Sequence, residues 1–257
     1  MFLAVAAGNA TLNGMEPPAE RILANLREVR DRIAAAAARS GRPAAAVRLV
    51  AVTKTVGEDA IRTLAGAGQK DLGENRAQQL RDRAAALADL RADWHMIGRL
   101  QRKNAKYVVP AAAMIHSVDS AELAAEIGRR ALAVAWQIQN RPVRTAPAAP
   151  MPCLLEVNSG EVQKAGVLPA EAPAAARAIA ATLGVSLVGL MTMAPLAENP
   201  ETVRPVFAAL RQLLERINRE AAPPRPLSEL SMGMTQDYEA AIEEGATLVR
   251  IGTALFR

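Results

Sequence analysis

The sequence offers little chemistry for a metal site, with one cysteine, Cys153, and two histidines, His95 and His116, among 257 residues. A single cysteine excludes an intrachain disulfide framework and any cysteine-based zinc or iron–sulfur centre. Two histidines disfavour a histidine-rich centre, so we expect no metal. Aromatic residues make up only 3% of the chain, which leaves few side chains on which the bases of single-stranded nucleic acid could stack.

Long apolar runs and a secretion signal are also missing. No stretch approaches the roughly 18 apolar residues of a membrane-spanning helix. The opening MFLAVAAGNATLNG lacks the basic start of a signal peptide. We therefore expect a cytoplasmic protein with no membrane contact. Residues 1–15 are interpreted as a disordered extension, or as the product of a start codon placed too early.

The composition indicates a globular, slightly basic protein. Apolar residues make up 51% of the chain, enough for a real core. Lysine and arginine exceed aspartate and glutamate by 31 to 26, a net charge of +5. This balance suits nucleic acid, a phosphorylated small molecule, or no special partner at all. Because the basic residues are spread evenly, we expect no nucleic-acid binding.

The chain alternates between strand and helix patterns. Residues 17–42 begin with two prolines and carry an apolar face that includes Ile22, Leu26, Val29 and Ile33, which predicts an N-terminal helix. Eight short apolar runs follow, each succeeded by a helical pattern. The expected strands are 47–54, 70–75, 93–98, 114–118, 153–158, 185–193, 227–233 and 247–252.

Strands that alternate with helices predict a parallel sheet in the α/β class. Eight such units are the number for a closed (β/α)8 barrel, or TIM barrel, with the N-terminal helix as an extra element. A doubly wound open sheet is the alternative. We expect one domain over residues 16–257, with a mobile Pro/Ala-rich loop at 140–152. Asn199 is expected to cap one late helix, and Thr235 another that Gly245 closes.

Functional residues of such barrels lie at the carboxyl ends of the strands. The residues expected there are Lys54, Asn75, His95, Asn158, Met193 and Ser231, with Arg250, Gly252 and Thr253 from the last strand. Lys54 closes the apolar run LVAVT. A desolvated lysine loses proton affinity, and its neutral amine can form a Schiff base. The alternative is that Lys54 simply extends to solvent.

Arg250 lies in the middle of the run TLVRIG and must point into the barrel or into the helix layer. A guanidinium only donates hydrogen bonds, so in either place it needs acceptors, and a structural salt bridge is the alternative reading. The segments SMGMT and IGT follow the last two strands, where barrels commonly bind phosphate. An inward lysine and a phosphate site together suggest pyridoxal phosphate (PLP).

The other polar residues carry weaker signals. His95 and His116 are interpreted as structural histidines, and Cys153 as an inert core residue. Glu74 and Glu156 are candidate acid–base groups, although no paired carboxylate spacing supports that use. The chain contains no GxxxxGK[ST], no GxSxG and no GxGxxG motif that opens a helix.

Seven segments, taken together, resemble the pyridoxal phosphate homeostasis protein family, also called the proline synthase co-transcribed homologue family. They are AVTKT, GENRAQQL, WHMIGRLQ, IHSVDS, EVNSGEVQKAGV, GLMTMAP and SMGMTQDYEAAIEEGATLVRIGTALF, in that order. The resemblance extends from about Arg21 to the C-terminus. It implies a barrel similar to the N-terminal domain of alanine racemase, which is a fold-type III PLP barrel.

The resemblance also implies roles for individual residues. Lys54 of AVTKT would form the internal aldimine with PLP, and Arg250 of VRIGT would hydrogen-bond the pyridine nitrogen. The residues implied for the phosphate are Ser231, Met232, Gly252 and Thr253, and those implied for the ring are Asn75 and Met193.

This chain departs from the family pattern at three places. Thr53 stands where the family usually has serine, which keeps a hydroxyl. The order of Lys103 and Asn104 is reversed, which puts any role of that pair in doubt. Glu156 replaces a common glutamine and adds a charge near the barrel.

The arginine expected at the pyridine nitrogen bears on whether the protein is an enzyme. Because arginine can only donate, the nitrogen stays unprotonated and the ring is a poorer electron sink. A racemase of this type also needs a tyrosine from a C-terminal domain, which we do not expect here because the sequence ends shortly after Thr253.

We therefore expect a monomeric PLP carrier or regulator without catalysis of its own, with PLP-dependent apo-enzymes as recipients. The alternatives are an alanine-racemase-like enzyme with weak activity on a small amino acid, and a cofactor-free aldolase that uses Lys54.

Overall fold

Eight parallel strands close into a barrel in the order β1 to β8, and β8 pairs back with β1. The computed structural model describes residues 17–139, 150–160, 165–221 and 223–257. The strands are β1 (Arg48–Val52), β2 (Asp71–Glu74), β3 (Asp93–Met96), β4 (Met114–Val118), β5 (Met151–Glu156), β6 (Val185–Met191), β7 (Glu229–Ser231) and β8 (Leu248–Ile251). The predicted (β/α)8 barrel is confirmed, and the open-sheet alternative is excluded.

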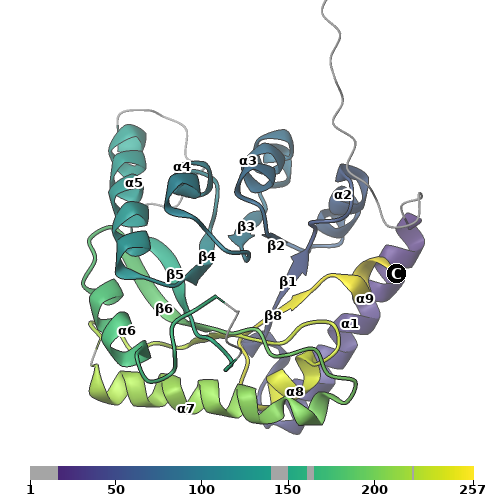
Figure 1. Ribbon diagram of the computed structural model, residues 1–257. Helices are drawn as coiled ribbons and strands as arrows, with labels where there is room; N and C mark the ends of the chain where they lie inside the picture. The colour runs from purple at the N-terminus through teal and green to yellow at the C-terminus, as the bar shows by residue number, and fades with distance from the viewer. Residues whose placement is uncertain (1–16, 140–149, 161–164, 222) are drawn as a thin grey trace, which may run out of the picture.

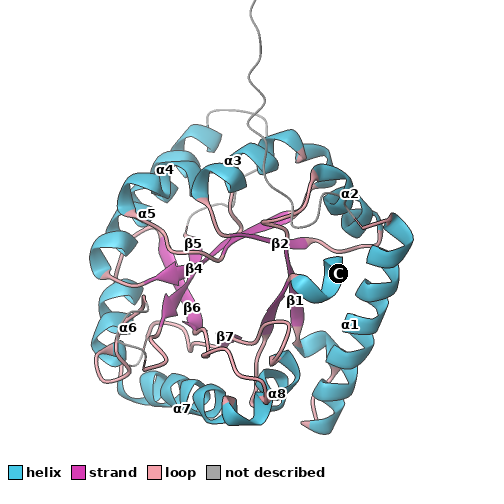
Figure 2. Cartoon of the chain, turned by 45° about the vertical axis from the view of Figure 1, so that its right-hand side comes forward, coloured by secondary structure: helices cyan, strands magenta, loops and turns pink. Residues whose placement is uncertain are grey.

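Helices surround the barrel as an outer ring (Figures 1 and 2). They are α1 (Ala19–Arg39), α2 (Glu58–Gly66), α3 (Ala77–Ala86), α4 (Ala105–Val108), α5 (Ala121–Gln139), α6 (Ala172–Ala180), α7 (Arg204–Glu220), α8 (Tyr238–Glu243) and α9 (Thr253–Phe256). Each strand is followed by a helix, because parallel neighbours need a crossover. The functional end of the barrel is the one where the chain leaves the strands and enters these helices.

The N-terminal helix α1 completes the ring beside the short last helix. Its predicted apolar face, with Ile22, Leu26, Val29 and Ile33, is buried. It packs against α2, α8 and α9. The α9 helix has only four residues, too few to cover β8 and β1, so α1 takes the place of a full-length eighth helix.

Polar contacts fix α1 in that place. The side-chain amide of Asn25 donates to the carbonyls of Leu255 and Arg257, at 3.2 and 2.9 Å. Arg39 pairs with Glu239 and Glu243 of α8. The first and last helices of the described chain therefore lie side by side in the ring and are joined by these hydrogen bonds.

Alternation along the strands divides the apolar residues into two cores. One set faces the helices, and a smaller set fills the inside of the barrel. The inner set is Val50, Met114, Leu154, Met191 and Leu248. Strand positions that alternate with the outer core therefore point into the barrel, and this determines which polar side chains are inside.

The predicted loop at 140–152 differs from the structure at its end. Residues 140–149 of the predicted loop lie outside the described residues, as does the predicted extension 1–15. Met151 and Pro152 of that loop instead begin β5, where Met151 is buried and pairs with Val185. Proline is tolerated at the start of a strand, because the sheet there loses only the one hydrogen bond that the missing N–H of proline would donate.

The predicted helix caps were partly right. Asn199 caps a 3₁₀ turn, Pro200–Thr202, that leads into α7. Thr235 does not cap α8, which begins three residues later at Tyr238, after Asp237 has accepted a bond from the amide of Met234. The predicted closure by Gly245, at φ +103°, is confirmed.

None of the helices in the described ranges is long and apolar enough to cross a membrane. The same ranges contain no group of three or more histidine, cysteine or acidic residues arranged to hold a metal ion.

Candidate functional site

Arg250 is a buried cation inside the barrel. Its neighbours Val249 and Ile251 face the outer core, so Arg250 points inward. One guanidinium nitrogen, Nη1, donates to Ser231 Oγ at 2.7 Å, and Nη2 donates to the Thr192 carbonyl at 2.9 Å. Burial lowers the pKa of Arg250 to about 10, and the charges of Asp237 and Glu156 oppose that shift. Arg250 therefore stays charged at neutral pH.

Lys54 lies at the rim of the same end of the barrel. β1 ends at Val52, and Lys54 follows in an exposed turn. Gly252, directly after β8, lies close to Val52: a side chain at this glycine would place its Cβ only 3.2 Å from Val52 Cβ. The turn that carries Lys54 therefore leaves the barrel beside the segment that begins at Gly252. The apolar surroundings expected for this lysine are absent, because the strand ends before it.

The turn of Lys54 is held by side chains of α3. Arg83 donates to the carbonyls of Thr53, at 2.6 Å, and Val56, and Gln79 donates to the Lys54 carbonyl at 3.2 Å. Arg83 also pairs with Glu74, whose side chain is fully buried and accepts from the Thr53 hydroxyl at 2.5 Å. Burial raises the pKa of Glu74, and the charge of Arg83 opposes the shift.

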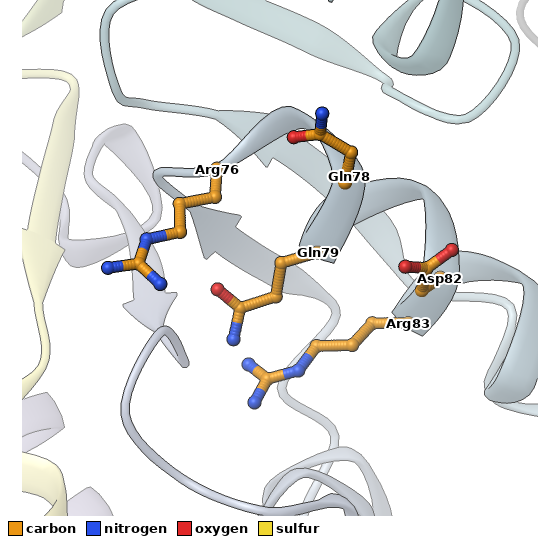
Figure 3. A pocket seen from close by; sticks show the side chains of 5 residues that line it. All are labelled: Arg76, Gln78, Gln79, Asp82 and Arg83. Carbon is orange, nitrogen blue, oxygen red and sulfur yellow. The ribbon is translucent and has the colours of Figure 1, made fainter. Parts of the chain in front are cut away.

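Figure 3 shows Arg76, just before α3, and Gln79 and Arg83 of α3 extending to the same side of the helix. They line a cavity of about 350 Å³ together with Gln78 and Asp82. The cavity holds none of the site residues predicted from sequence. Two of the residues that line it, Gln79 and Arg83, are nevertheless the ones that hold the turn of Lys54.

Replacing Arg83 with methionine is expected to lower the free energy of unfolding by about 2–3 kcal/mol. Glu74 would stay buried without its cation, and two carbonyls would lose their donor. The matched control is Arg62→Met, because Arg62 pairs only at the surface with Asp89 and should change stability by less than about 0.5 kcal/mol. Urea unfolding of both variants measures the difference, and equal losses would contradict the role of Arg83.

The loop after β7 contacts both β8 and the segment that follows β8. The Gly233 carbonyl accepts from the amide of Arg250 at 3.0 Å, and Gly233 has φ +92°, which favours glycine. The Thr235 hydroxyl accepts from the amide of Ala254 at 3.4 Å. The loop after β7 therefore lies beside the segment that follows β8.

The remaining predicted residues fall into different places. Asn75 is exposed after β2, and Met193 is half-buried against the inner apolar set. Ser231 is the last residue of β7, and its buried hydroxyl accepts from Arg250 inside the barrel. The Met232 side chain belongs to the outer core, and its amide donates to the Leu248 carbonyl.

Glu156 enters the barrel from β5. It lies two residues after Leu154 of the inner set, on the same face of the strand, and is 3% exposed. Its Oε2 atom has no hydrogen-bond partner among the residues described. Burial raises the pKa of Glu156 to about 7, and Asp119 adds to the shift while Arg250 and Arg99 oppose it. A buried carboxyl group that titrates near neutrality therefore lies in the field of Arg250.

The interpretation of His95 and His116 as structural histidines agrees with their burial, although His95 contacts Asp71 at the start of β2 and not the carboxyl ends of the strands. His95 and His116 are fully buried inside the barrel, and His116 lies 2.9 Å from the Ser231 hydroxyl. The available signal was alternation, because Trp94 and Met96 on one strand and Ile115 on the next face the outer core. Cys153, by contrast, is buried in the outer core as expected, and burial raises the pKa of its thiol.

Comparison with known proteins first gives the class of barrel. The family model "Alanine racemase, N-terminal domain" matches residues 24–257. An alanine racemase from Corynebacterium glutamicum superposes with a TM-score of 0.59 at 16% identity, over 92% of this chain and 60% of that chain. This likeness shows the fold alone.

More similar proteins then give the family. The pyridoxal phosphate homeostasis protein of Aquifex aeolicus is 42% identical over 90% of this chain and 95% of its own length. The human protein of the same name is 35% identical over 90% and 84%. The structure of PipY from Synechococcus elongatus with PLP bound has a TM-score of 0.73 at 34% identity, over 93% of this chain and 99% of that one. The chain belongs to the pyridoxal phosphate homeostasis protein family.

Proposed function

We propose that this protein binds PLP at the carboxyl end of the barrel and acts in PLP homeostasis. The observation that carries the proposal is Arg250, a buried, charged donor fixed by Ser231 and Thr192. Those two bonds use two of the five N–H donors of the guanidinium. The others suit an acceptor such as the pyridine nitrogen of PLP. Family membership and the PLP-bound structure of PipY support the proposal.

The other residues fit the remaining groups of PLP. The Lys54 amine, in its neutral form, would add to the aldehyde carbon, and loss of one water molecule would leave a C=N bond. Bound in this way, PLP supplies an electron-accepting ring. Gly252 and Thr253, with Gly233 and Thr235 of the loop after β7, would hold the phosphate through backbone amides and hydroxyls. Asn75 and Met193 would lie along the ring.

We further propose that the protein carries PLP without catalysing a reaction on it. A donor at the pyridine nitrogen keeps that atom unprotonated, which disfavours carbanion chemistry. The chain has two tyrosines, Tyr107 and Tyr238. Tyr238 lies in the outer core under Arg32 of α1, and Tyr107 packs against Arg81 of α3. Neither is placed to act as a base inside the barrel.

We also propose an oligomeric state, a location and recipients for this carrier. A carrier of this chemistry would act as a monomer in the cytoplasm and pass PLP to apo-enzymes that depend on it. Exchange of PLP from the purified carrier into a PLP-dependent apo-enzyme would support direct delivery. Recovery of activity no faster than with the same concentration of free PLP would contradict it.

A PLP titration tests the proposed binding. Cofactor-free protein mixed with PLP is expected to become yellow and to show a near-ultraviolet and visible band that borohydride removes. Pyridoxal, which lacks the phosphate, should bind at least tenfold more weakly because the loops after β7 and β8 would lose their ligand. A protein that stays colourless with PLP would contradict the proposal and favour a cofactor-free use of Lys54.

The second candidate function is a weak alanine-racemase-like activity on a small amino acid, and Glu156 is the observation that favours it. A carboxyl group with a pKa of about 7 can accept a proton near neutral pH. Exchange of an amino acid α-proton with solvent, present in the wild type with PLP and absent in Glu156→Gln, would establish this activity. No exchange in the wild type would leave the carrier function.

Glu156 also gives a pH-dependent stability prediction for the cofactor-free protein. Its pKa is raised from an ordinary 4.5 to about 7 in the folded state, so the folded state holds the proton more tightly than the unfolded state. The stabilisation this gives is complete below pH 4.5 and is lost as the pH rises to about 7. Relative to wild type, Glu156→Gln should gain up to roughly 3 kcal/mol between pH 4.5 and 8. Urea unfolding at both pH values measures this, and an unchanged difference would contradict the prediction.

A further inference from the structure

A continuous row of hydrogen bonds crosses the inside of the barrel. It starts at Arg250, passes to Ser231 Oγ at 2.7 Å, and continues from that hydroxyl to His116 Nδ1 at 2.9 Å. His116 Nε2 lies 2.9 Å from His95 Nδ1, and His95 Nε2 lies 2.9 Å from Asp71 Oδ1. Asp71 also accepts from Arg48 at 2.7 Å. We call these side chains, from Arg250 to Asp71, the barrel relay.

The barrel relay joins the two ends of the barrel. Arg250 and Ser231 lie toward the carboxyl ends of β8 and β7, whereas Asp71 is the first residue of β2. The inner apolar set and Glu156 also lie in the barrel interior. Because each relay residue alternates with outer-core neighbours on its strand, all of them point inward.

When each histidine carries one proton, the two ends of the barrel relay determine the direction of its hydrogen bonds. Burial alone raises the pKa of Asp71, but bonds from His95 and Arg48 and their charges lower it below its ordinary value, so Asp71 is an ionised acceptor. Burial, with the charges of His95 and Arg250, holds the pKa of His116 well below its ordinary value, so His116 is neutral. When His95 carries a single proton, donation from Nε2 to Asp71 places that proton on Nε2 and leaves Nδ1 as an acceptor.

The same reasoning reaches Ser231. His116 Nε2 must donate to His95, so His116 Nδ1 can only accept, and the Ser231 hydroxyl must donate to it. The lone pairs of Ser231 Oγ are then left to face the Nη1 donor of Arg250. A serine hydroxyl without this constraint rotates freely among acceptors, so His116 determines which way Ser231 presents its oxygen.

We propose that His116 is a positioning residue, which fixes the guanidinium of Arg250 for its ligand through Ser231. The proposal rests on the PLP-binding function proposed above. None of the ion pairs in the described ranges includes Arg250. The guanidinium of Arg250 instead donates to the hydroxyl of Ser231 and to the carbonyl of Thr192. The hydroxyl is therefore half of what holds this cation in place. His95 and Asp71 act behind His116 by fixing the position of its protons.

Three variants and a control separate positioning from packing. His116→Phe keeps a ring of similar size and removes the acceptor for Ser231. His116→Asn keeps a short acceptor near the Nδ1 position, and Ser231→Ala removes the hydroxyl itself. Leu154→Ala damages the apolar part of the same interior and should cost about 2–5 kcal/mol of stability without touching the barrel relay.

Nitrogen-15 NMR of the cofactor-free protein at pH 8 gives a readout that does not depend on PLP. In the wild type, His116 should carry its proton on Nε2, and the guanidinium protons of Arg250 should exchange slowly. His116→Phe and Ser231→Ala should speed that exchange at least tenfold, whereas Leu154→Ala and His116→Asn should leave it near the wild-type rate. A proton on Nδ1 of His116 in the wild type would overturn the proposal, even if no variant folds.

PLP titration then links positioning to binding. His116→Phe should weaken PLP binding by about tenfold, the effect of one hydrogen bond to a charged group, and His116→Asn should restore most of it. Unchanged exchange of Arg250 in His116→Phe, or equal loss of affinity in Leu154→Ala, would contradict the role of His116. If the wild type binds no PLP while the NMR results hold, the proposed function fails and the positioning of Arg250 stands.

Discussion

Lys54→Met protein is expected to form no covalent complex with PLP, and to lack the yellow band of the wild type at every PLP concentration. Methionine has a similar length and no amine, so the C=N bond cannot form while the exposed turn keeps its backbone bonds from Gln79 and Arg83. Noncovalent binding through Arg250 and the phosphate loops should remain, but weaker by at least a hundredfold. Absorbance spectra and equilibrium dialysis measure the two effects.

The matched control for this prediction is Lys70→Met. Lys70 is also exposed, but it comes directly before β2, at the opposite end of the barrel. The Lys70→Met protein should bind PLP as tightly as the wild type and give the same band. If Lys54→Met keeps the band and Lys70→Met loses it, PLP binds at the end of the barrel opposite to the proposed site.

Arg250→Met protein is expected to bind PLP about 10- to 100-fold more weakly than the wild type. The variant loses the charged donor to the pyridine nitrogen, and a hydrogen bond to a charged group contributes about 1.5–3 kcal/mol. The Lys54 turn lies on other elements, so the C=N band should still form at high PLP concentration. Titration of the band gives the affinity, and borohydride reduction confirms that the link is unchanged.

The control for Arg250 is Arg177→Met, in which an exposed arginine of α6 loses only a contact with the carbonyl of Glu220. Its PLP affinity should equal that of the wild type. Arg250→Lys adds a second comparison, because it keeps the charge and loses the fork that reaches Ser231 and Thr192 together. We expect an intermediate affinity. Wild-type affinity in Arg250→Met would exclude Arg250 from the site.

The fold could be predicted from the sequence because its signals are local. Eight apolar runs and the helices between them give the barrel, and the period of α1 correctly gives its buried face. Boundaries were less certain, since strand ends depend on pairing with neighbours. Met151 is in β5 because it pairs with Val185 of β6, a partner 34 residues away that no local pattern reveals.

The site could be predicted only in outline. Strand ends and family resemblance led to Lys54, Arg250 and the two loops, which do lie at one end of the barrel. The support around them depends on residues from distant elements. Arg83 of α3 binds the turn after β1, and His116 of β4 binds Ser231 of β7. Such contacts follow from closure of the barrel and not from spacing in the chain.

The most direct test of PLP binding by Lys54 is to map the modified lysine. Wild-type protein is saturated with PLP, reduced with borohydride and digested, and the peptides are analysed by mass spectrometry. The chain has five lysines, Lys54, Lys70, Lys103, Lys106 and Lys164. We predict one reduced pyridoxyl phosphate group per chain, on Lys54. The same group on another lysine, or none on any, would contradict the proposed site.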